Sequence, residues 1–427
     1  MSAVSAQDAA GTESWLPSSA ACERLGVKPA TLYAYVSRGL VHSRRGADGR
    51  SRLYSAEDLD RLLLRAERRR DPEEQVRGAL DWGGPVLDSE LTLIEDGRYY
   101  YRGRDATGLA TSSRIEEVAA LLWLGRPEAW REIFPARLEP LPRSWRPALG
   151  RVAGAHPGET LQVALRLAAS EDPGAFDRRP ERSSRCGARI LGTLAMAVSR
   201  LEHPVRDGVA GALRRGWVAR RPDAQPVIDA ALVLLADHEL NVSSFTARCI
   251  ASAGSSPYDA VCGGLAALRG FRHGGCSDQM EALVLGAGVG PGMRAAPPRE
   301  RLREALARRL AAGGPVPGFG HRLYPRGDPR CRALMDLMQE RFPSSRVVAA
   351  LAALAVEGES LLGDRPNVDF ALAGLSAELG LRPGGAFAVF ALGRTVGWIA
   401  HALEEYSRDR LIRPRARYVG APAGSGR

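Results

Sequence analysis

The sequence predicts a mainly α-helical protein that consists of a small basic N-terminal unit and a larger body. Apolar residues recur at helical spacing along most of the 427 residues, which indicates amphipathic helices. Strands and helices do not alternate regularly, and no glycine-rich phosphate loop follows a strand, which argues against a doubly wound α/β fold. The composition changes character at about residue 73, and this change separates the two parts. With 45% hydrophobic and 25% charged residues, the chain is globular and not wholly disordered.

The chain carries a net charge of +10, and per residue its N-terminal part is the more basic. Arginine makes up all but one of the 59 basic residues, the exception being Lys28, so part of the charge reflects a bias in composition. Residues 24–70 nevertheless hold twelve basic against five acidic side chains, a local excess of +7. A basic cluster of this kind is typical of a surface that meets nucleic acid.

Cysteine usage and hydropathy predict a reduced, cytoplasmic protein. None of the six cysteines forms a C-x-x-C pair, so neither a disulfide framework nor a structural zinc site is expected. Residues 1–15 lack the basic and apolar regions of a secretory signal. The longest clean apolar run, Val347–Val356, is about half a membrane span.

Residues 15–72 predict a helix–turn–helix followed by a basic hairpin and a third helix, after a disordered tail at 1–14. Ser18 or Ser19 is expected to cap the first helix, and Pro29 suits the first position of the second. Asp48-Gly49 lies between short extended stretches and predicts the turn of a hairpin. Ser55-x-x-Asp58 is the pattern of a capping box and opens the third helix.

This unit resembles the winged helix-turn-helix of the mercury-resistance-regulator (MerR) type. The matching stretches are Cys22-Glu23-Arg24-Leu25-Gly26-Val27-Lys28-Pro29-Ala30-Thr31-Leu32 and Ser51-Arg52-Leu53-Tyr54-Ser55-Ala56-Glu57-Asp58-Leu59. The resemblance implies that the second helix enters the major groove of DNA and that the hairpin neutralises phosphates. The candidate DNA contacts are Thr31, Tyr33, Tyr35, Arg38, Arg44, Arg45, Arg50 and Arg52. The alternative is an accessory domain that makes protein contacts and binds no DNA.

The body begins with a short ribbon and continues as helices. Leu91–Tyr101 reads as two extended stretches around Asp96-Gly97. Ile228–Leu235 carries a helical apolar face that is expected to continue to His238. Other apolar-faced helices are expected at about 115–124, 157–169, 186–201, 258–269, 300–312, 345–361, 371–379 and 385–406.

Three histidines and one aspartate stand in unusual settings. His238 follows Asp237, whereas His273 and His321 adjoin glycines that let a ligand approach the backbone. Asp369 lies between apolar neighbours, where a desolvated carboxylate can act as a base. Each residue taken singly has an ordinary structural reading, and together the four could hold zinc. No closely spaced histidine pair seeds a metal site, however, so no metal is expected.

Taken in order, these residues resemble the citrate synthase family, over nearly all of 85–420. The matching stretches are Tyr101-Arg102-Gly103-Arg104-Asp105, Asp237-His238-Glu239-x-Asn241-x-Ser243-Ser244-x-Thr246-x-Arg248, His273-Gly274-Gly275, Pro317-Gly318-Phe319-Gly320-His321-Arg322-x-Tyr324, Asp328-Pro329-Arg330, Pro366-Asn367-Val368-Asp369-Phe370, Arg394-Thr395-Val396-Gly397-Trp398-Ile399-Ala400-His401 and Arg413-Pro414-Arg415. The resemblance implies an acyltransferase of the tricarboxylic acid cycle that joins acetyl-CoA to oxaloacetate and hydrolyses the thioester to citrate and CoA. It implies no cofactor and no metal, because acetyl-CoA is a substrate.

The resemblance assigns a role to each chemical group. Asp369 is the base that removes a proton from the acetyl methyl group, and His273 hydrogen-bonds the thioester oxygen. His321 polarises the ketone of oxaloacetate. The implied oxaloacetate ligands are His238, Arg330, Arg394 and Arg413, because arginine binds carboxylates bidentately. The implied CoA-binding loop is Val316, Pro317, Gly318, Phe319 and Gly320.

The resemblance also implies a homodimer of two-domain subunits. Arg413 would be lent by the second subunit, and domain closure would exclude water from the site. The large domain would span 73–274 and 381–427, and the small domain 275–380. The chain departs from the family pattern at Cys276-Ser277-Asp278, where alanine, asparagine and an acid or amide are usual.

Two other functions remain open at this stage. A 2-methylcitrate synthase would carry the same motifs and take propionyl-CoA. A transcription regulator could use the fold to bind a metabolite without turnover.

Overall fold

The computed structural model describes residues 15–37, 40–45, 51–56, 58–59, 62, 87–311, 313, 316–421 and 423. Contacts divide the chain into two compact units, 1–88 and 89–427, and each is described by itself. The expected tail at 1–14, the hairpin turn at Asp48-Gly49, and both Arg38 and Arg50 lie outside the described residues.

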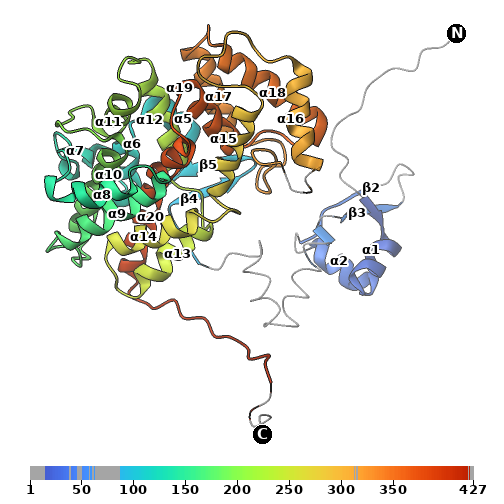
Figure 1. The fold of residues 1–427 in the computed structure, drawn as a ribbon. Coiled ribbons are helices and arrows are strands. Elements are labelled where there is room, and N and C mark those ends of the chain that lie inside the picture. Colours follow the sequence, from blue (N-terminus) through green and yellow to red (C-terminus); the bar gives the residue numbers. More distant parts are fainter. Residues whose placement is uncertain are drawn as a thin grey trace. The chain divides into compact units, whose positions relative to one another are not determined.

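In the N-terminal unit the structure describes two whole helices, a three-stranded sheet and helical residues at 56, 58–59 and 62, where the third helix is expected (Figure 1). The strands β1, β3 and β2 lie in that order and are antiparallel. In chain order the elements are β1 (Trp15–Pro17), α1 (Ser18–Leu25), α2 (Pro29–Ser37), β2 (Ser43–Arg45) and β3 (Arg52–Ser55). The two strands on either side of the expected hairpin turn are therefore present, and Pro29 begins the second helix as expected.

The first helix differs from its prediction in its N-terminal cap. Pro17 occupies the position before α1, and no side chain caps the helix, so the expected serine cap is wrong. Gly26 ends α1 with a left-handed φ of 62°, which a glycine adopts without steric cost. Leu32 of α2 and Tyr54 of β3 are fully buried in a small core between helices and sheet.

The body begins with an antiparallel ribbon and continues as helices. Asp96 and Gly97 both have positive φ and join β4 (Thr92–Glu95) to β5 (Arg98–Tyr101), as the Asp-Gly pair predicts. The strand β6 (Arg104–Asp105) pairs with β5. The longer helices are α5 (Ala106–Ser112), α6 (Ile115–Leu124), α8 (Arg146–Val152), α9 (Pro157–Ser170), α10 (Pro180–Ser199), α11 (Gly208–Trp217), α12 (Ala224–Leu235), α13 (Val242–Ser252), α14 (Pro257–Leu268), α15 (Gly275–Gly286), α16 (Arg299–Ala311), α17 (Pro329–Arg341), α18 (Arg346–Leu362), α19 (Val368–Leu379) and α20 (Gly385–Arg408). The mainly α-helical prediction is confirmed.

The last helix, α20, forms the centre of the body. It is long and apolar enough to cross a membrane, but 94% of its most apolar window is buried inside the protein. Trp398 in this helix is fully buried, and its indole packs so closely on Gly264 of α14 that an added Cβ would lie 2.5 Å from the ring. The apolar composition of α20 therefore serves the core of the body.

The helices on either side of α20 form two groups in Figure 1, with α7 (Trp130–Ile133) to α11 on one side and α16–α18 on the other. This grouping is what a large and a small domain would give, and the boundaries at 275 and 381 stay a prediction.

Candidate active site

His238 lies in a loop between α12 and α13. The helix α12 ends at Leu235, so the expected continuation of the helix to His238 is wrong. Glu239 turns the chain with a φ of 52°, and Asn241 caps α13 by accepting the backbone N–H groups of Ser243 and Ser244, both at 3.1 Å. The loop thus brings His238 next to the N-terminus of α13.

The imidazole of His238 is buried among other rings. Its Nε2 lies 2.8 Å from the hydroxyl of Tyr324, and its ring centroid lies 5.4 Å from that of His321. Burial lowers the pKa of His238 well below its usual value, and the charges of Arg330 and Arg394 lower it further. His238 is therefore neutral at pH 7.

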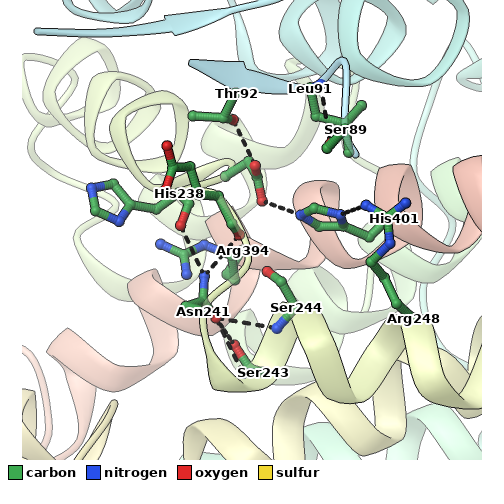
Figure 2. A network of polar contacts seen from close by, with 12 residues as sticks. Ser89, Leu91, Thr92, His238, Asn241, Ser243, Ser244, Arg248, Arg394 and His401 are labelled. Carbon is green, nitrogen blue, oxygen red and sulfur yellow. Dashed lines mark hydrogen bonds and ion pairs between the residues drawn. The ribbon is translucent and has the colours of Figure 1, made fainter. Parts of the chain in front are cut away.

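A chain of buried polar groups supports the residue before His238 (Figure 2). Asp237 accepts a hydrogen bond from Thr92 at 2.6 Å and lies 3.2 Å from Nε2 of His401. The Nδ1 atom of His401 lies 2.9 Å from Arg248, which pairs with Glu405 at 2.8 Å. Because arginine can only donate, Nδ1 of His401 accepts, so Nε2 carries the proton and donates to Asp237.

The second histidine, His321, has a defined tautomer. The backbone N–H of Leu323 donates to Nδ1 of His321 at 3.2 Å. Burial and the charge of Arg330 lower the pKa of His321 to about 4, so the ring is neutral at pH 7. The proton of the neutral ring must then lie on Nε2, which makes this atom a hydrogen-bond donor.

The third histidine, His273, forms a hydrogen bond with Ser243 in the first turn of α13. Its Nε2 lies 2.9 Å from Oγ of Ser243, which also lies 2.7 Å from Oδ1 of Asn241. Burial and the charge of Arg394 lower the pKa of His273 to about 4, so this ring is also neutral at pH 7. Oδ1 of Asn241 can only accept, so the Ser243 hydroxyl donates to it and Nε2 of His273 carries the ring proton. Turning the hydroxyl proton from Asn241 to Nε2 would move the ring proton to Nδ1, which could then donate to a ligand.

Asp369 lies in the first turn of α19 and accepts a hydrogen bond from Ser277 of α15. Burial raises the pKa of Asp369 to about 6, and the hydrogen bond from Ser277 opposes this rise. A carboxylate with a pKa near neutrality is ionised at pH 7 and accepts a proton more readily than an ordinary aspartate does.

Two buried arginines bring positive charge to the same centre. Asp328 forms a fork with Arg330, at 3.0 and 2.8 Å, and also accepts the N–H of Val368 at the start of α19. Burial lowers the pKa of Arg394 to about 10, so its guanidinium remains charged at pH 7. Arg394 donates through Nε to the carbonyl of Leu235 at 2.8 Å, and its Nη groups make no hydrogen bond within the described part of the chain. These groups remain available to an anionic ligand.

The predicted CoA-binding loop lies beside the start of α19. Phe319 and Pro366 form an antiparallel bridge, and the side chain of Asn367 donates to the carbonyl of Gly320 at 2.9 Å. Gly318 has a φ of 81°, and an added Cβ would lie 2.6 Å from the sulfur of Met280, so only glycine fits. Val316, Pro317 and Gly318 are buried.

Arg413 does not join this centre within one chain. It is exposed and lies in the irregular segment that follows α20. Figure 1 shows this segment leaving the helical body as an extended strand of chain. The remaining predicted oxaloacetate residues, His238, Arg330 and Arg394, are buried.

Four residues that support the site received no role from the sequence alone. They are Ser243, Ser277, Tyr324 and Asp328. All four lie within or next to the quoted motifs, and Ser277 also departs from the family pattern. Their positions in the motifs were the available signal, whereas their partners depend on the tertiary fold. In the described part of the chain, no three histidine, cysteine or acidic residues gather as a metal site.

The predicted DNA contacts that the structure describes lie on α2 and on the paired strands β2 and β3. Tyr33 is 50% exposed, and Thr31 and Tyr35 are partly buried. Arg44, Arg45 and Arg52 are exposed on the strands, and the guanidinium of Arg44 lies 4.5 Å from the ring centroid of Trp15.

Comparisons with known proteins find two families in this chain. Residues 79–415 match the model of the citrate synthase C-terminal domain, and residues 16–67 match the MerR HTH family of regulatory proteins. Citrate synthase 2 of Bacillus subtilis is 29% identical over 362 residues, which are 79% of this chain and 94% of that protein. The 2-methylcitrate synthase of Mycobacterium tuberculosis strain H37Rv is 30% identical over 342 residues, covering 75% of this chain and 84% of that protein.

Solved structures show the same fold. The citrate synthase of Thermotoga maritima matches with a TM-score of 0.66 and 27% identity, covering 79% of this chain and 94% of that chain. The citrate synthase of Thermoplasma acidophilum, solved in ternary complex with carboxymethyl coenzyme A and oxaloacetate, matches with a TM-score of 0.67 at 22% identity over the same shares of the two chains.

Proposed function

The chain belongs to the citrate synthase family, and on that premise we propose that it condenses acetyl-CoA with oxaloacetate and water to give citrate and CoA. The observation that carries the proposal is the convergence of Asp369, His273 and His321 with the buried cations Arg330 and Arg394. A carboxylate base, two neutral imidazole donors and two cations are the groups that this condensation needs.

In the proposed reaction, the ionised Asp369 removes a proton from the methyl group of acetyl-CoA. The hydroxyl of Ser243 turns its proton to Nε2 of His273 when substrate binds, and the Nδ1–H of the ring then donates to the thioester oxygen, which stabilises the enol that forms. A thioester α-proton is so weakly acidic that the base and this donor must act together. Burial lowers the pKa of His273 to about 4, which keeps the ring neutral at pH 7. His273 therefore donates a hydrogen bond as a neutral imidazole and not as a cation.

The enol carbon then attacks the ketone carbon of oxaloacetate. The Nε2–H of His321 polarises the ketone oxygen, and that oxygen becomes the alkoxide that takes up a proton. The guanidinium groups of Arg330 and Arg394 bind the carboxylates of oxaloacetate, with His238 beside them. Water finally cleaves the thioester of the condensation product and releases citrate and CoA.

Release of free thiol from acetyl-CoA in the presence of oxaloacetate tests this function. The second candidate is 2-methylcitrate synthesis, which the 30% identity to the mycobacterial enzyme favours. One methylene in an apolar pocket is worth about 1–3 kcal/mol, so we expect kcat/KM for acetyl-CoA to exceed that for propionyl-CoA by about 10-fold or more. A preference for propionyl-CoA would replace the first candidate with the second. Absence of thiol release with both thioesters would favour a metabolite-sensing regulator.

We further propose that the N-terminal unit binds duplex DNA. Its match to the MerR HTH family and the exposed arginines on β2 and β3 support this proposal. Changing Arg44, Arg45, Arg50 and Arg52 to glutamate should abolish binding at low salt, because each arginine that meets a phosphate releases a counterion. Fluorescence anisotropy of labelled duplexes over a salt series measures the effect.

A matched reversal on the body controls for the change in net charge. Arg143, Arg151, Arg182 and Arg185 are exposed there. Their change to glutamate should leave the salt slope of DNA binding almost unaltered. If both quadruple variants weaken binding equally, the basicity of the whole chain is responsible and the N-terminal unit is not a specific DNA-binding module.

A further inference from the structure

Ser277 departs from the family pattern, and its side chain contacts the proposed base, Asp369. It is the third residue of α15 and lies four positions after His273. Its side chain is fully buried. Its hydroxyl donates to Oδ1 of Asp369, which lies on the neighbouring helix α19.

The surroundings of Asp369 make this hydrogen bond the main constraint on its carboxylate. The backbone N–H of Asp369 donates to the side chain of Asn367 at 3.0 Å, which fixes the main chain at the start of α19. Oδ1 is held by Ser277, whereas Oδ2 accepts no hydrogen bond within the described part of the chain. The two oxygens of one carboxylate therefore have different environments.

We propose that Ser277 is a positioning residue for the proposed base: its hydroxyl holds one carboxylate oxygen of Asp369 and thereby turns the other toward the substrate. The proposal rests on the proposed function, because it assigns Asp369 the removal of the methyl proton. It adds a residue whose type departs from the asparagine that is usual in the family pattern at this position.

A serine at this position has two physical consequences. A hydroxyl has one proton, and in a buried site that proton must find an acceptor, so a carboxylate neighbour fixes its direction. A hydrogen bond to the ionised form favours ionisation, and it opposes the effect of burial on the carboxyl group. Ser277 would therefore both orient the base and keep it ionised at neutral pH.

Ser277→Ala tests the proposal, because it removes the hydroxyl and keeps the helix. We expect kcat to fall by about 10- to 100-fold, with KM for oxaloacetate little changed. Loss of the donor should raise the pKa of Asp369, so the acid limb of the kcat profile should move upward by about 0.5–1 pH unit. Ser277→Thr keeps the hydroxyl and should restore the wild-type pH profile.

Ser184→Ala is a matched control. Ser184 is also a fully buried helical serine, but its hydroxyl donates only to the backbone carbonyl of Pro180 at 2.7 Å in the described part of the chain. If the loss of a buried hydroxyl lowers kcat only by destabilising the fold, Ser277→Ala and Ser184→Ala should lower it alike. Only Ser277→Ala should move the pH profile.

Infrared difference titration gives a readout that does not depend on turnover. The C=O stretch of protonated Asp369, identified by its loss in Asp369→Asn, should titrate at higher pH in Ser277→Ala than in wild type. Unchanged titration together with an unchanged pH profile would overturn the proposal and leave the proposed function intact. Absence of activity in the wild type would instead overturn the proposed function, and the infrared titration would still decide whether Ser277 controls the carboxylate.

Discussion

Asp369→Asn is expected to lower kcat at least ~10³-fold while the affinity for oxaloacetate stays within about twofold. Asparagine has nearly the size of aspartate and can still accept the hydrogen bond from Ser277. It cannot accept the methyl proton, so the enol does not form. Calorimetry of oxaloacetate binding and steady-state release of thiol, measured on the same preparation, separate the two effects.

The pH dependence of the wild type follows from the same residue. Burial raises the pKa of Asp369 to about 6, and the base works only when it is ionised. Activity should therefore be full above this value and should fall as the pH decreases through about 6. An ordinary aspartate would keep its activity to about pH 4, so the position of the acid limb reports the burial of Asp369.

Asp364→Asn provides the matched control for this change. Asp364 is an exposed carboxylate five positions before Asp369 and lies next to Gly320. Its amide variant should retain wild-type kcat. Turnover that survives in Asp369→Asn would contradict the assignment of the base.

Mixed dimers are expected to recover activity that two separate variants lose. Arg413 lies outside the buried centre of its own chain, and we propose that it completes the oxaloacetate site of a second subunit. Loss of a bidentate carboxylate contact costs about 2–4 kcal/mol, so Arg413→Ala should lower kcat/KM for oxaloacetate by about 30-fold or more. Asp369→Asn inactivates the site of its own chain.

A dimer that contains one subunit of each variant has one complete site and one doubly defective site. Random mixing makes about half of the dimers mixed, so the mixture should reach about a quarter of wild-type activity. The measurement is thiol release after joint refolding or co-expression of the two variants. A mixture of Asp369→Asn with His273→Ala gives the control. Each of these changes disables the site of the chain that carries it, so the mixed dimer has no complete site. Failure of the Asp369 and Arg413 variants to complement each other would show that Arg413 acts within its own chain or not at all.

Much of the fold follows from local sequence signals. The apolar spacing predicts the helices near 157–169, 345–361 and 385–406, which the structure has as α9, α18 and α20. Asp96-Gly97 predicts the ribbon, because both residues must adopt positive φ at such a turn. These features depend on interactions between residues that are close in the sequence, and a single sequence contains all of that information.

The sequence is less informative where tertiary contacts decide. The apolar spacing of α12 predicts a helix as far as His238, but the helix ends at Leu235. Asp237 hydrogen-bonds instead to Thr92 and His401, which are distant in sequence. Ser277 is visible as a departure from a pattern, yet its contact with Asp369 depends on how α15 packs against α19. The motifs identify the chemical groups of the site, and the packing of distant helices determines their hydrogen bonds and pKa shifts.

The most direct test of the account is the identity of the product. Purified full-length protein should convert acetyl-CoA and oxaloacetate into equal amounts of citrate and CoA, measured by NMR of the reaction mixture, and Asp369→Asn should form neither. Release of CoA without citrate, or citrate formation that persists in Asp369→Asn, would contradict a condensation that begins with proton removal by Asp369.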